Sequence, residues 1–325
     1  MKIVITGGCG FLGLGIARVL MGRGDIDAVT LFDAVVPDTL PDGLDDRISL
    51  VAGDIADRDR VTALIDGDDI AVFHLASVVS AGAEQDFDLA MRVNFDGVLN
   101  VLEACRAWNS APKVVFASSL AVFGGEALPE NVTDMTRVTP GTTYGMTKAV
   151  GELMINDYTR KGFIDGRTAR LPTVIIRPGP PNAAASGFAS GVFREPLAGE
   201  EFVLPVGMET KMMVLGYRNA VAGLIGLMDA DGVALGAALG TDRVVALPNN
   251  AYSVAEMIAA LEAVAAAKGI TLGPITPKPD PATEAIVTSW PLAMDDARAR
   301  ALGLPADESL ERVIGDYIED FGTGQ

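Results

Sequence analysis

A tyrosine and a lysine four residues apart, Tyr144 and Lys148, are the residues whose types and spacing most directly indicate acid–base chemistry. On a helix, side chains four apart lie on the same face, one turn from each other. A lysine cation beside a phenol favours the phenolate and so lowers the pKa of the tyrosine. Such a tyrosine can exchange a proton with a hydroxyl group near neutral pH. The spacing also fits an ordinary amphipathic helix, so the rest of the chain decides between the two interpretations.

A serine is the second candidate for this site. Ser119 ends the apolar run 113–119, which we expect to be a buried strand, and it precedes Tyr144 by 25 residues. Ligands of open α/β sheets collect at the carboxyl ends of the strands. A loop and a helix of ordinary length can therefore bring Ser119 and Tyr144 to the same sheet edge.

A glycine-rich turn follows the β-branched run 2–6 and precedes a helical pattern. It contains three glycines spaced G-x-x-G-x-x-G and two apolar residues, namely Gly7, Gly10, Phe11, Leu12 and Gly13. Glycines there permit a tight turn, a close backbone approach to a pyrophosphate and close helix–strand packing. The N–H groups of the helix N-terminus can then bind the phosphates. The pattern favours a dinucleotide site over a merely structural turn.

Two acids end the next predicted strands. Asp33 ends the strand 28–33, 20 residues after Gly13. An acid there accepts hydrogen bonds from the adenosine ribose and repels a 2′-phosphate, which favours NAD over NADP. The alternative is that Asp33 caps a turn. Asp54, at the end of the strand 48–54, could reach an adenine amino group.

The fourth predicted strand, 71–76, contains His74, the only histidine of the chain. We expect a buried, hydrogen-bonded histidine there rather than a catalytic one. Ser77 and Ser80 line the loop at the carboxyl end of this strand. A long helix over about 83–108 is predicted to follow, with Asn94 in its middle.

The composition excludes several classes of protein. The net charge of −18 and the pI of about 4.4 argue against nucleic acid and anionic membranes as partners. Cys9 and Cys105 cannot form a disulfide framework, no metal-ligand spacing surrounds them, and Cys9 is interpreted as a space-filler. No apolar run is long enough to span a membrane, and the apolar N-terminus lacks a signal-peptide cleavage site. We therefore expect a cytoplasmic protein without a metal.

The composition changes after Pro178. A strand over 170–177 is predicted to be irregular or near a sheet edge because it contains Pro172. The Gly-, Pro- and Ser-rich stretch 178–191 is typical of a lid or substrate loop. Later elements are expected at 244–248, 254–267, 292–302 and 307–320, with a Pro-rich connection over 273–283. The predicted division is a Rossmann domain of 1–177 plus about 212–248, and a substrate lobe of about 178–211 and 249–325.

Taken together, these motifs resemble the extended short-chain dehydrogenase/reductases, which include nucleotide-sugar epimerases and dehydratases. The resemblance rests on TGGCGFLG at 6–13, Asp33, Gly53-Asp54-Ile55, Ala117-Ser118-Ser119, Val122-Phe123-Gly124, Tyr144-x-x-x-Lys148 and Arg177-Pro178-Gly179. It implies an α/β fold, a Rossmann-type doubly wound parallel sheet with a smaller interleaved C-terminal lobe. It also implies NAD as cofactor and the family's usual dimer, built on the helices before and after the fifth strand.

The resemblance also implies a role for each matching residue. Tyr144 would be the general acid/base, Lys148 would lower its pKa and hold the nicotinamide ribose, and Ser119 would hydrogen-bond the reacting oxygen. Asn94 would hold a structural water. The residues expected to contact NAD are Gly7, Gly10, Phe11, Leu12, Gly13, Asp33, Asp54, Ile55, Leu75, Ala76, Ser77, Asn94, Tyr144, Lys148 and Pro178.

A closer resemblance, to the D-erythronate dehydrogenase subgroup, runs through the stretches 73–80, 158–167, 177–182, 188–197 and 289–291. It implies oxidation of the 2-hydroxyl of a four-carbon sugar acid by NAD, from D-erythronate to 2-oxo-erythronate. Leu120 and Phe123 stand where many epimerases have a small residue and a tyrosine, which weakens an epimerase interpretation.

An anionic sugar acid needs a cation in its site, because burying an unpaired carboxylate is costly. Arg194 is the first candidate for this role, with Lys211 and Arg218 as rivals. Ser80, Ser119 and Asn182 are the other expected substrate contacts. Two alternative functions stay open, namely a nucleoside-diphosphate-sugar epimerase or dehydratase with tightly held NAD, and a non-catalytic NAD(H)-binding sensor.

Overall fold

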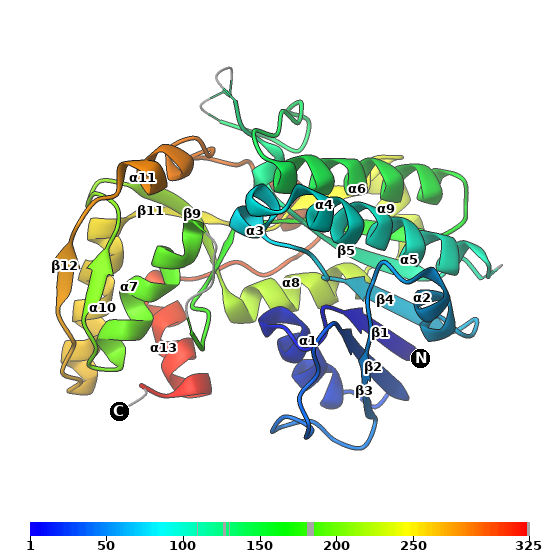
Figure 1. Cartoon of the computed structure of the whole chain (residues 1–325), viewed down its shortest axis with the longest axis horizontal. Coiled ribbons are helices and arrows are strands. Elements are labelled where there is room, and N and C mark those ends of the chain that lie inside the picture. Colours follow the sequence, from blue (N-terminus) through cyan, green and yellow to red (C-terminus); the bar gives the residue numbers. More distant parts are fainter. Residues whose placement is uncertain (109, 126–127, 130, 181–184, 324–325) are drawn as a thin grey trace. The chain divides into compact units, whose positions relative to one another are not determined.

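The computed structural model describes residues 1–108, 110–125, 128–129, 131–180 and 185–323 (Figure 1). These residues group into two compact units. The first comprises 1–122, 140–170 and 221–245, and the second comprises 123–139, 171–220 and 246–325. The division differs from the predicted one at 123–139 and 171–177, which group with the second unit.

A seven-stranded sheet forms the first unit, in the order β10-β6-β5-β4-β1-β2-β3. Its strands are β1 (Lys2–Thr6), β2 (Ala28–Asp33), β3 (Ile48–Ala52), β4 (Ile70–His74), β5 (Lys113–Ser119), β6 (Asp165–Leu171) and β10 (Val244–Ala246). The pairs β1–β2, β1–β4, β2–β3 and β4–β5 are parallel. The central strands β1, β4 and β5 are mostly apolar runs, and their side chains are largely buried on both faces. The predicted Rossmann-type α/β fold is confirmed.

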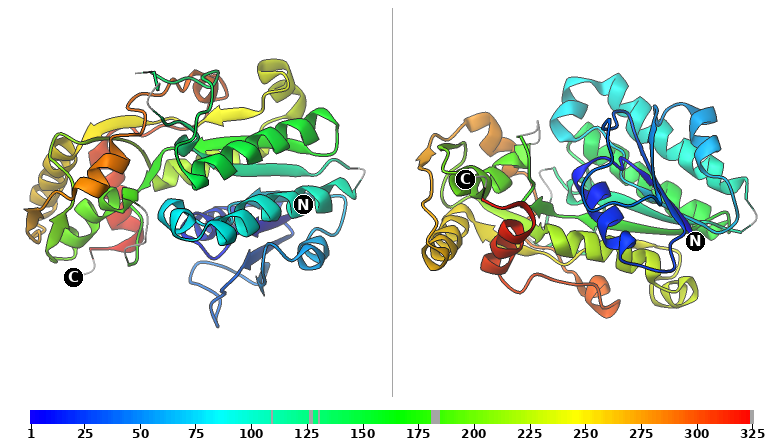
Figure 2. Two further views of the ribbon diagram at one scale, coloured as in Figure 1. Left: turned by 45° about the horizontal axis from the view of Figure 1, so that its top comes forward. Right: turned by 90° about the horizontal axis from the view of Figure 1, so that it is seen from below.

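Helices cover both faces of this sheet. They are α1 (Phe11–Met21), α2 (Arg58–Leu64), α3 (Ser80–Gln85), α4 (Phe87–Ala90), α5 (Gly97–Arg106), α6 (Thr143–Arg160), α8 (Tyr217–Asp229, in this unit from Val221) and α9 (Gly232–Leu239). Helices α5 and α6 lie over one face, and α1 and α8 lie over the other (Figure 2). Helix α6 therefore packs directly against β5 within the first unit.

The predicted long helix over 83–108 is wrong as a single element. The chain forms α3 and α4, then a π-helical segment over Met91–Asp96, and only then α5. Asp86 separates the first two helices, because its extended backbone ends α3 and its side chain accepts the Leu89 N–H at 2.9 Å as the cap of α4. Helical periodicity in the sequence does not reveal such a break.

Several strands end at other residues than the sequence predicts. The predicted strand 170–177 is wrong, because β6 ends at Leu171 and a separate strand, β7 (Thr173–Ile175), belongs to another sheet. Pro172 separates them, since proline has no N–H to give to a sheet. The strands predicted over 48–54, 71–76 and 244–248 end at Ala52, His74 and Ala246.

The second unit contains two small sheets. β7, β9 (Lys211–Gly216) and β11 (Asn250–Ser253) form one in the order β11-β9-β7, while β8 (Phe202–Leu204) pairs in parallel with β12 (Ile275–Pro277). The helices are α7 (Phe188–Leu197), α10 (Val254–Lys268), α11 (Pro281–Val287), α12 (Ala297–Ala301) and α13 (Leu310–Phe321). The stretch 273–283, which the sequence predicts to be a connection, contains β12 and the start of α11. The helix predicted over 292–302 is only α12.

Helix α10 has the predicted start. Ser253 accepts the Glu256 N–H at 3.2 Å, and the Glu256 carboxylate accepts the Ser253 N–H at 2.7 Å, so the capping box is confirmed. Gly269, in the left-handed conformation, ends the helix. The apolar side of α10 packs in one core cluster that also includes residues of α7 and α13.

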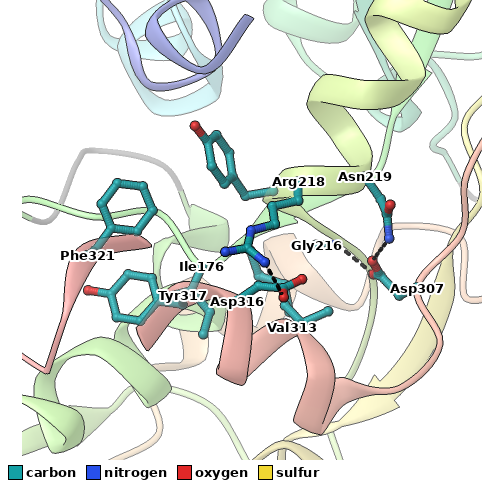
Figure 3. Close-up of a pocket in the computed structure, with 11 residues that line it drawn as sticks. Ile176, Gly216, Arg218, Asn219, Asp307, Val313, Asp316, Tyr317 and Phe321 are labelled. Atoms are coloured by element: carbon teal, nitrogen blue, oxygen red, sulfur yellow. Dashed lines mark hydrogen bonds and ion pairs between the residues drawn. The ribbon is translucent and has the colours of Figure 1, made fainter. Parts of the chain in front are cut away.

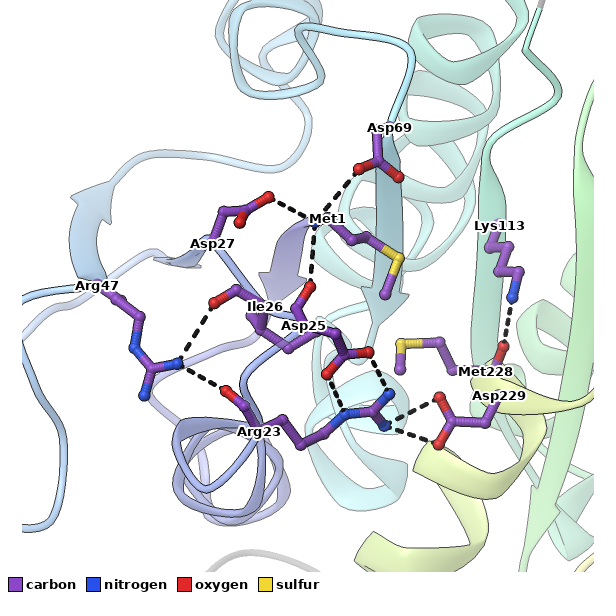
Figure 4. A network of polar contacts seen from close by, with 10 residues as sticks. All are labelled: Met1, Arg23, Asp25, Ile26, Asp27, Arg47, Asp69, Lys113, Met228 and Asp229. Carbon is purple, nitrogen blue, oxygen red and sulfur yellow. Dashed lines mark hydrogen bonds and ion pairs between the residues drawn. The ribbon is translucent and has the colours of Figure 1, made fainter.

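Polar contacts close the amino-terminal edge of the first unit (Figure 4). Arg23, just after α1, forms ion pairs with Asp25 and Asp229, and both Asp229 oxygens lie within 2.9 Å of its Nη1 atom. The Met1 ammonium pairs with Asp27 and Asp69. These contacts join the ends of α1 and α8 at the edge of the sheet opposite to the carboxyl ends of its strands.

In the described part of the chain, no single helix is long and apolar enough to span a membrane. Helices α8 and α9 reach that length and apolar composition only as a pair, with a bend of 100° between them.

Candidate active site

Helix α6 approaches the end of β5 very closely at its first turn. Thr142 begins the helix by accepting the Gly145 N–H at 3.1 Å. A Cβ atom at Gly145 would collide with the Ala121 carbonyl oxygen, and one at Gly151 would lie 2.6 Å from the Phe116 ring. The two glycines therefore let α6 lie against β5 more closely than any other residue would allow.

The close approach brings the predicted catalytic residues together. The Lys148 Nζ atom donates a hydrogen bond to the Ala117 carbonyl oxygen at 2.8 Å and lies 5.6 Å from the centre of the Tyr144 ring. Ser119 lies near enough to the Tyr144 hydroxyl to oppose the effect of burial on the tyrosine pKa. Ser119 also accepts the Ala121 N–H at 3.1 Å, which orients its hydroxyl. Tyr144, Lys148 and Ser119 thus form one cluster within the first unit.

The pKa shift of Tyr144 has the opposite direction to the one that the sequence predicts. Burial raises the pKa of Tyr144, and the nearby Ser119 side chain opposes this rise. Burial also lowers the pKa of Lys148 to about 7, against the opposing charge of Glu152. The predicted lowering of the tyrosine pKa by Lys148 is therefore not present in this structure, because burial dominates at both residues.

The glycine turn forms a backbone cradle. Gly7 has a φ of +68°, and a Cβ atom there would lie 2.8 Å from the Ala76 nitrogen. A Cβ atom at Gly13 would lie 2.7 Å from the Gly8 Cα atom. Gly10 begins α1 without a side-chain cap, and Phe11 and Leu12 form its first turn. A bare helix N-terminus behind a glycine turn fits the pyrophosphate of a dinucleotide.

Asp33 lies beside this cradle. One carboxylate oxygen accepts the Cys9 N–H at 3.1 Å, and the other accepts the Ala34 N–H at 2.8 Å. These bonds hold the carboxylate at the end of β2, where an adenosine ribose would be recognised. Burial, followed by the charge of Asp33, raises the pKa of the Cys9 thiol to about 11, so it is a poor nucleophile.

The second predicted acid has a different environment. The Asp54 carboxylate is paired with Arg92 and accepts the Ala56 N–H at 2.9 Å. Ile55 is buried, and its carbonyl oxygen accepts a hydrogen bond from Asn100 at 3.1 Å. An adenine amino group at Asp54 would share the carboxylate with Arg92.

Asn94 joins the loop after β4 to α6. Its amide oxygen accepts the Val78 N–H at 2.7 Å and the Ser77 hydroxyl at 3.1 Å. Its amide nitrogen donates to the Val78 carbonyl at 3.0 Å and to the Thr147 hydroxyl at 3.2 Å. Asn94 is buried, so its direct contacts are with the protein, and it positions the loop that begins with Leu75 and Ala76 and ends at Ser80.

His74 is buried, as predicted. Its Nδ1 atom lies 2.7 Å from the Thr6 hydroxyl, and its ring stacks on Phe116 at 5.8 Å. Burial, followed by the charge of Lys148, lowers the pKa of His74 to about 3. The histidine is therefore neutral at physiological pH.

The predicted carboxylate-binding arginine of the second unit, Arg194, already has partners in the protein. Arg194, on α7, pairs with Glu195 at 2.5 Å and donates to the Arg177 carbonyl at 2.9 Å. Arg177 precedes Pro178 and donates to the Pro180 carbonyl at 2.6 Å, and within the described ranges no acidic residue pairs with it. Burial and then the charge of Arg194 lower the pKa of Arg177. Asn182 lies outside the described residues.

The two rival cations have different surroundings. Arg218 forms ion pairs with three acids of α13, Asp316, Glu319 and Asp320. Figure 3 shows the pair with Asp316. A substrate carboxylate at Arg218 would meet these acids, which disfavours it as an anion site. Lys211 is exposed at the start of β9. In the described part of the chain, no three His, Cys, Asp or Glu side chains are arranged to hold a metal ion.

Sequence reasoning missed four residues that shape these sites. They are Gly145, Glu152, Arg170 and Arg177. Glu152 follows Lys148 by the same four residues that separate Lys148 from Tyr144, so the spacing could have indicated that Glu152 lies on the same helix face. No local pattern indicates that Arg170, on β6, pairs with Glu152.

Comparisons with known proteins agree with this arrangement. The NAD dependent epimerase/dehydratase family matches residues 3–228. D-erythronate dehydrogenase of Cupriavidus necator is 46% identical over 336 aligned residues, which cover 100% of each chain. D-erythronate dehydrogenase of Haemophilus influenzae is 41% identical, covering 98% of this chain and 99% of that protein.

Solved structures show the same fold. The nucleoside-diphosphate-sugar epimerase from Agrobacterium tumefaciens has a TM-score of 0.90 and 37% identity, covering 100% of this chain and 95% of that one. The UDP-glucose 4-epimerase of Thermus thermophilus, in complex with NAD, has a TM-score of 0.77 and 19% identity, covering 99% and 100%.

The chain therefore belongs to the NAD dependent epimerase/dehydratase family, and the predicted family resemblance is confirmed. The glycine cradle and Asp33 fit its cofactor, NAD. With two dehydrogenases matching along the whole chain, it is an NAD-dependent dehydrogenase.

Proposed function

We propose that this enzyme oxidises the 2-hydroxyl of D-erythronate, a four-carbon sugar acid, to give 2-oxo-erythronate. The names of the two full-length relatives support this substrate. The observation that carries the chemistry is the cluster of Tyr144, Ser119 and Lys148, in which the Lys148 Nζ atom lies 5.6 Å from the centre of the Tyr144 ring. Such a cluster can bind a hydroxyl group and remove its proton.

In the proposed mechanism, Ser119 donates a hydrogen bond to the substrate oxygen and so stabilises the carbonyl that develops there. Tyr144, as phenolate, accepts the proton of the 2-hydroxyl. NAD⁺, when bound, supplies the hydride acceptor. A protonated Lys148 favours the phenolate, since an opposite charge nearby favours the ionised form of an acid. Its hydrogen bond to the Ala117 carbonyl holds the ammonium group below the tyrosine ring.

For the substrate carboxylate we propose Arg194 together with Arg177. Arg194 already pairs with Glu195, so Arg177 brings a second, unneutralised guanidinium to the same part of the second unit. Arginine suits this role because its planar fork can hold a carboxylate with two hydrogen bonds. Ser80 and Asn182 stay proposed contacts of the substrate hydroxyls.

The decisive experiment follows NADH absorbance with purified protein, NAD⁺ and a panel of D-erythronate, L-threonate, related sugar acids and UDP-sugars. We expect NADH only with sugar acids, and most with D-erythronate. Tyr144→Phe should lower kcat/KM about 10²- to 10⁴-fold. Activity retained in Tyr144→Phe would rule out the proposed proton acceptor.

The carboxylate site has its own test. Arg194→Ala and Arg177→Ala should each raise the KM for the acid far more than the KM for NAD⁺. Arg218→Ala is the matched control, because its guanidinium is occupied by three acids, and it should leave the KM for the acid unchanged. Equal effects on both Michaelis constants would remove Arg177 and Arg194 from the substrate site.

A nucleoside-diphosphate-sugar epimerase is the second candidate function. The 37% identity to the nucleoside-diphosphate-sugar epimerase from Agrobacterium tumefaciens favours it. Such an enzyme keeps NAD bound through its cycle, so it releases no NADH. Interconversion of a UDP-sugar seen by chromatography, with no NADH from any acid, would support this function over ours.

We also propose a homodimer in the cytoplasm. Helices α4 and α6 each expose a large apolar side chain, since Phe87 is 56% exposed and Leu153 is 65% exposed. A dimer would bury such residues. Light scattering after gel filtration should give twice the chain mass, and Leu153→Lys should reduce it to that of one chain.

A further inference from the structure

A buried carboxylate lies one helical turn beyond Lys148. Glu152 is only 3% exposed, and Lys148 is 4% exposed. The two carboxylate oxygens of Glu152 accept three hydrogen bonds, from the Ser118 hydroxyl at 2.7 Å and from Nε and Nη2 of Arg170 at 2.9 and 2.8 Å. Tyr144, Lys148 and Glu152, spaced by four, thus form one stripe along α6.

This stripe contacts three consecutive residues at the end of β5. Tyr144 lies near Ser119, Lys148 donates to the Ala117 carbonyl, and Glu152 accepts from Ser118. Arg170 extends the same contact to β6, the neighbouring strand. The position of α6 along the sheet is therefore determined by the residues that would perform the chemistry and by Glu152.

A structural explanation alone accounts poorly for such a pair. Burying two charges costs several kcal/mol per ion in order of magnitude, and an apolar pair of similar volume is often as stable or more so. The Glu152–Arg170 pair is nonetheless next to a second buried cation, Lys148. Its position suggests an effect on that cation rather than on the stability of the unit.

We propose that Glu152 is a positioning residue, which through Ser118 and Arg170 holds α6 against the sheet and so keeps a negative charge one helical turn from the Lys148 ammonium group behind Tyr144. The inference rests on the proposed function, in which Lys148 favours the Tyr144 phenolate. Glu152 touches neither the substrate nor the reacting atoms, so it acts through Lys148.

The charges around Lys148 support this role. Among the described residues, the titratable groups facing it are Tyr144 and Glu152 on α6 and His74 on β4, with Arg170 on β6 behind Glu152. β5 contributes only a backbone carbonyl and the Phe116 ring, 5.0 Å from Nζ. Burial lowers the pKa of Lys148 to about 7, and Glu152 opposes this. Without Glu152, Lys148 would lose its proton at still lower pH.

The main test is Glu152→Gln. Without the charge of Glu152, Lys148 should lose its proton at lower pH, and it does so before Tyr144 ionises. The pH midpoint of kcat/KM that the Lys148 proton sets should therefore fall by about one unit. An unchanged midpoint would overturn the proposal.

Two further variants separate charge from position. Glu152→Asp keeps the charge but cannot reach both partners, so we expect an unchanged pH midpoint and a kcat about tenfold lower. Glu152→Gln/Arg170→Gln also removes the positive charge of Arg170 from behind residue 152, so its midpoint should return part of the way. Should Glu152→Gln not fold, Glu152→Asp decides, and a wild-type kcat there would overturn the proposal.

The control is Asp165→Asn, which breaks another ion pair of β6, between Asp165 and the buried Arg167 at 2.5 Å. It should lower stability and leave the pH midpoint unchanged, and an equal shift there would overturn the proposal. If Tyr144→Phe is inactive but Glu152→Gln leaves the pH midpoint unchanged, only the role of Glu152 is refuted. An active Tyr144→Phe protein refutes the proposed function instead.

Discussion

The Nζ atom of Lys148 donates a hydrogen bond to the carbonyl oxygen of Ala117 at 2.8 Å, from the middle of α6 to the end of β5. This bond fixes the lysine to the backbone of the sheet rather than to the tyrosine hydroxyl. Burial lowers the pKa of the same lysine to about 7. The protein therefore retains a cation in a place where its charge is unfavourable, which indicates a role other than stability.

Lys148→Met should separate function from stability. We expect kcat/KM to fall about 10²- to 10⁴-fold, because Tyr144 loses the cation that favours its ionised form. The unfolded state binds more protons than the folded state between about pH 7 and the ordinary lysine pKa of 10.5, so the wild type gains stability as pH rises through this range. Urea unfolding of both proteins at several pH values measures this gain, which the variant should lack.

His74 should make the protein acid-sensitive. Its pKa is lowered to about 3 in the folded state, against an ordinary value of 6.5. The unfolded chain then binds more protons below pH 6.5, so stability is full above that pH and falls between 6.5 and 3. Because His74 is the only histidine, loss of unfolding free energy between pH 6.5 and 5 is attributable to it. His74→Asn should flatten this slope, and an equal slope in both proteins would contradict the assignment.

Gly145→Ala should disturb the site through the backbone. Its Cβ atom would collide with the Ala121 carbonyl, so α6 must move away from β5 and Tyr144 from Ser119. We expect a loss of about 2 kcal/mol or more in unfolding free energy, together with most of the activity. The matched control is Gly315→Ala in α13, where a Cβ atom meets nothing within 4 Å. That variant should be neutral or stabilised by about 0.5–1 kcal/mol.

Asp33 should determine the choice between NAD and NADP. Asp33→Ala removes an acceptor for the ribose hydroxyls and a charge that repels a 2′-phosphate. A hydrogen bond to a charged group contributes about 1.5–3 kcal/mol, so the preference for NAD⁺ in kcat/KM should fall at least about tenfold. Asp33→Asn keeps an oxygen that can accept the Cys9 N–H and separates the loss of charge from a disturbed loop. An unchanged preference in both variants would remove Asp33 from the ribose site.

Much of the first unit follows from the sequence. The β-branched runs, the glycine turn before α1 and the Ser119–Tyr144–Lys148 spacing predict a Rossmann-type sheet and its catalytic cluster, because each depends on neighbours in the chain. The errors occur where the determining contact is distant or depends on backbone geometry. Pro172 separates two strands that join different sheets, and Asp86 divides the predicted long helix.

The sequence by itself predicted the fold class through local periodicity, and the family resemblance added the cofactor and the candidate catalytic residues Ser119, Tyr144 and Lys148. Only the tertiary structure decided the charge state and the support of that cluster. Burial reverses the expected pKa shift of Tyr144, and Glu152 finds its partner in Arg170, 18 residues later and on another element. Desolvation and long-range pairing depend on which elements pack together, and no local pattern in the chain encodes them.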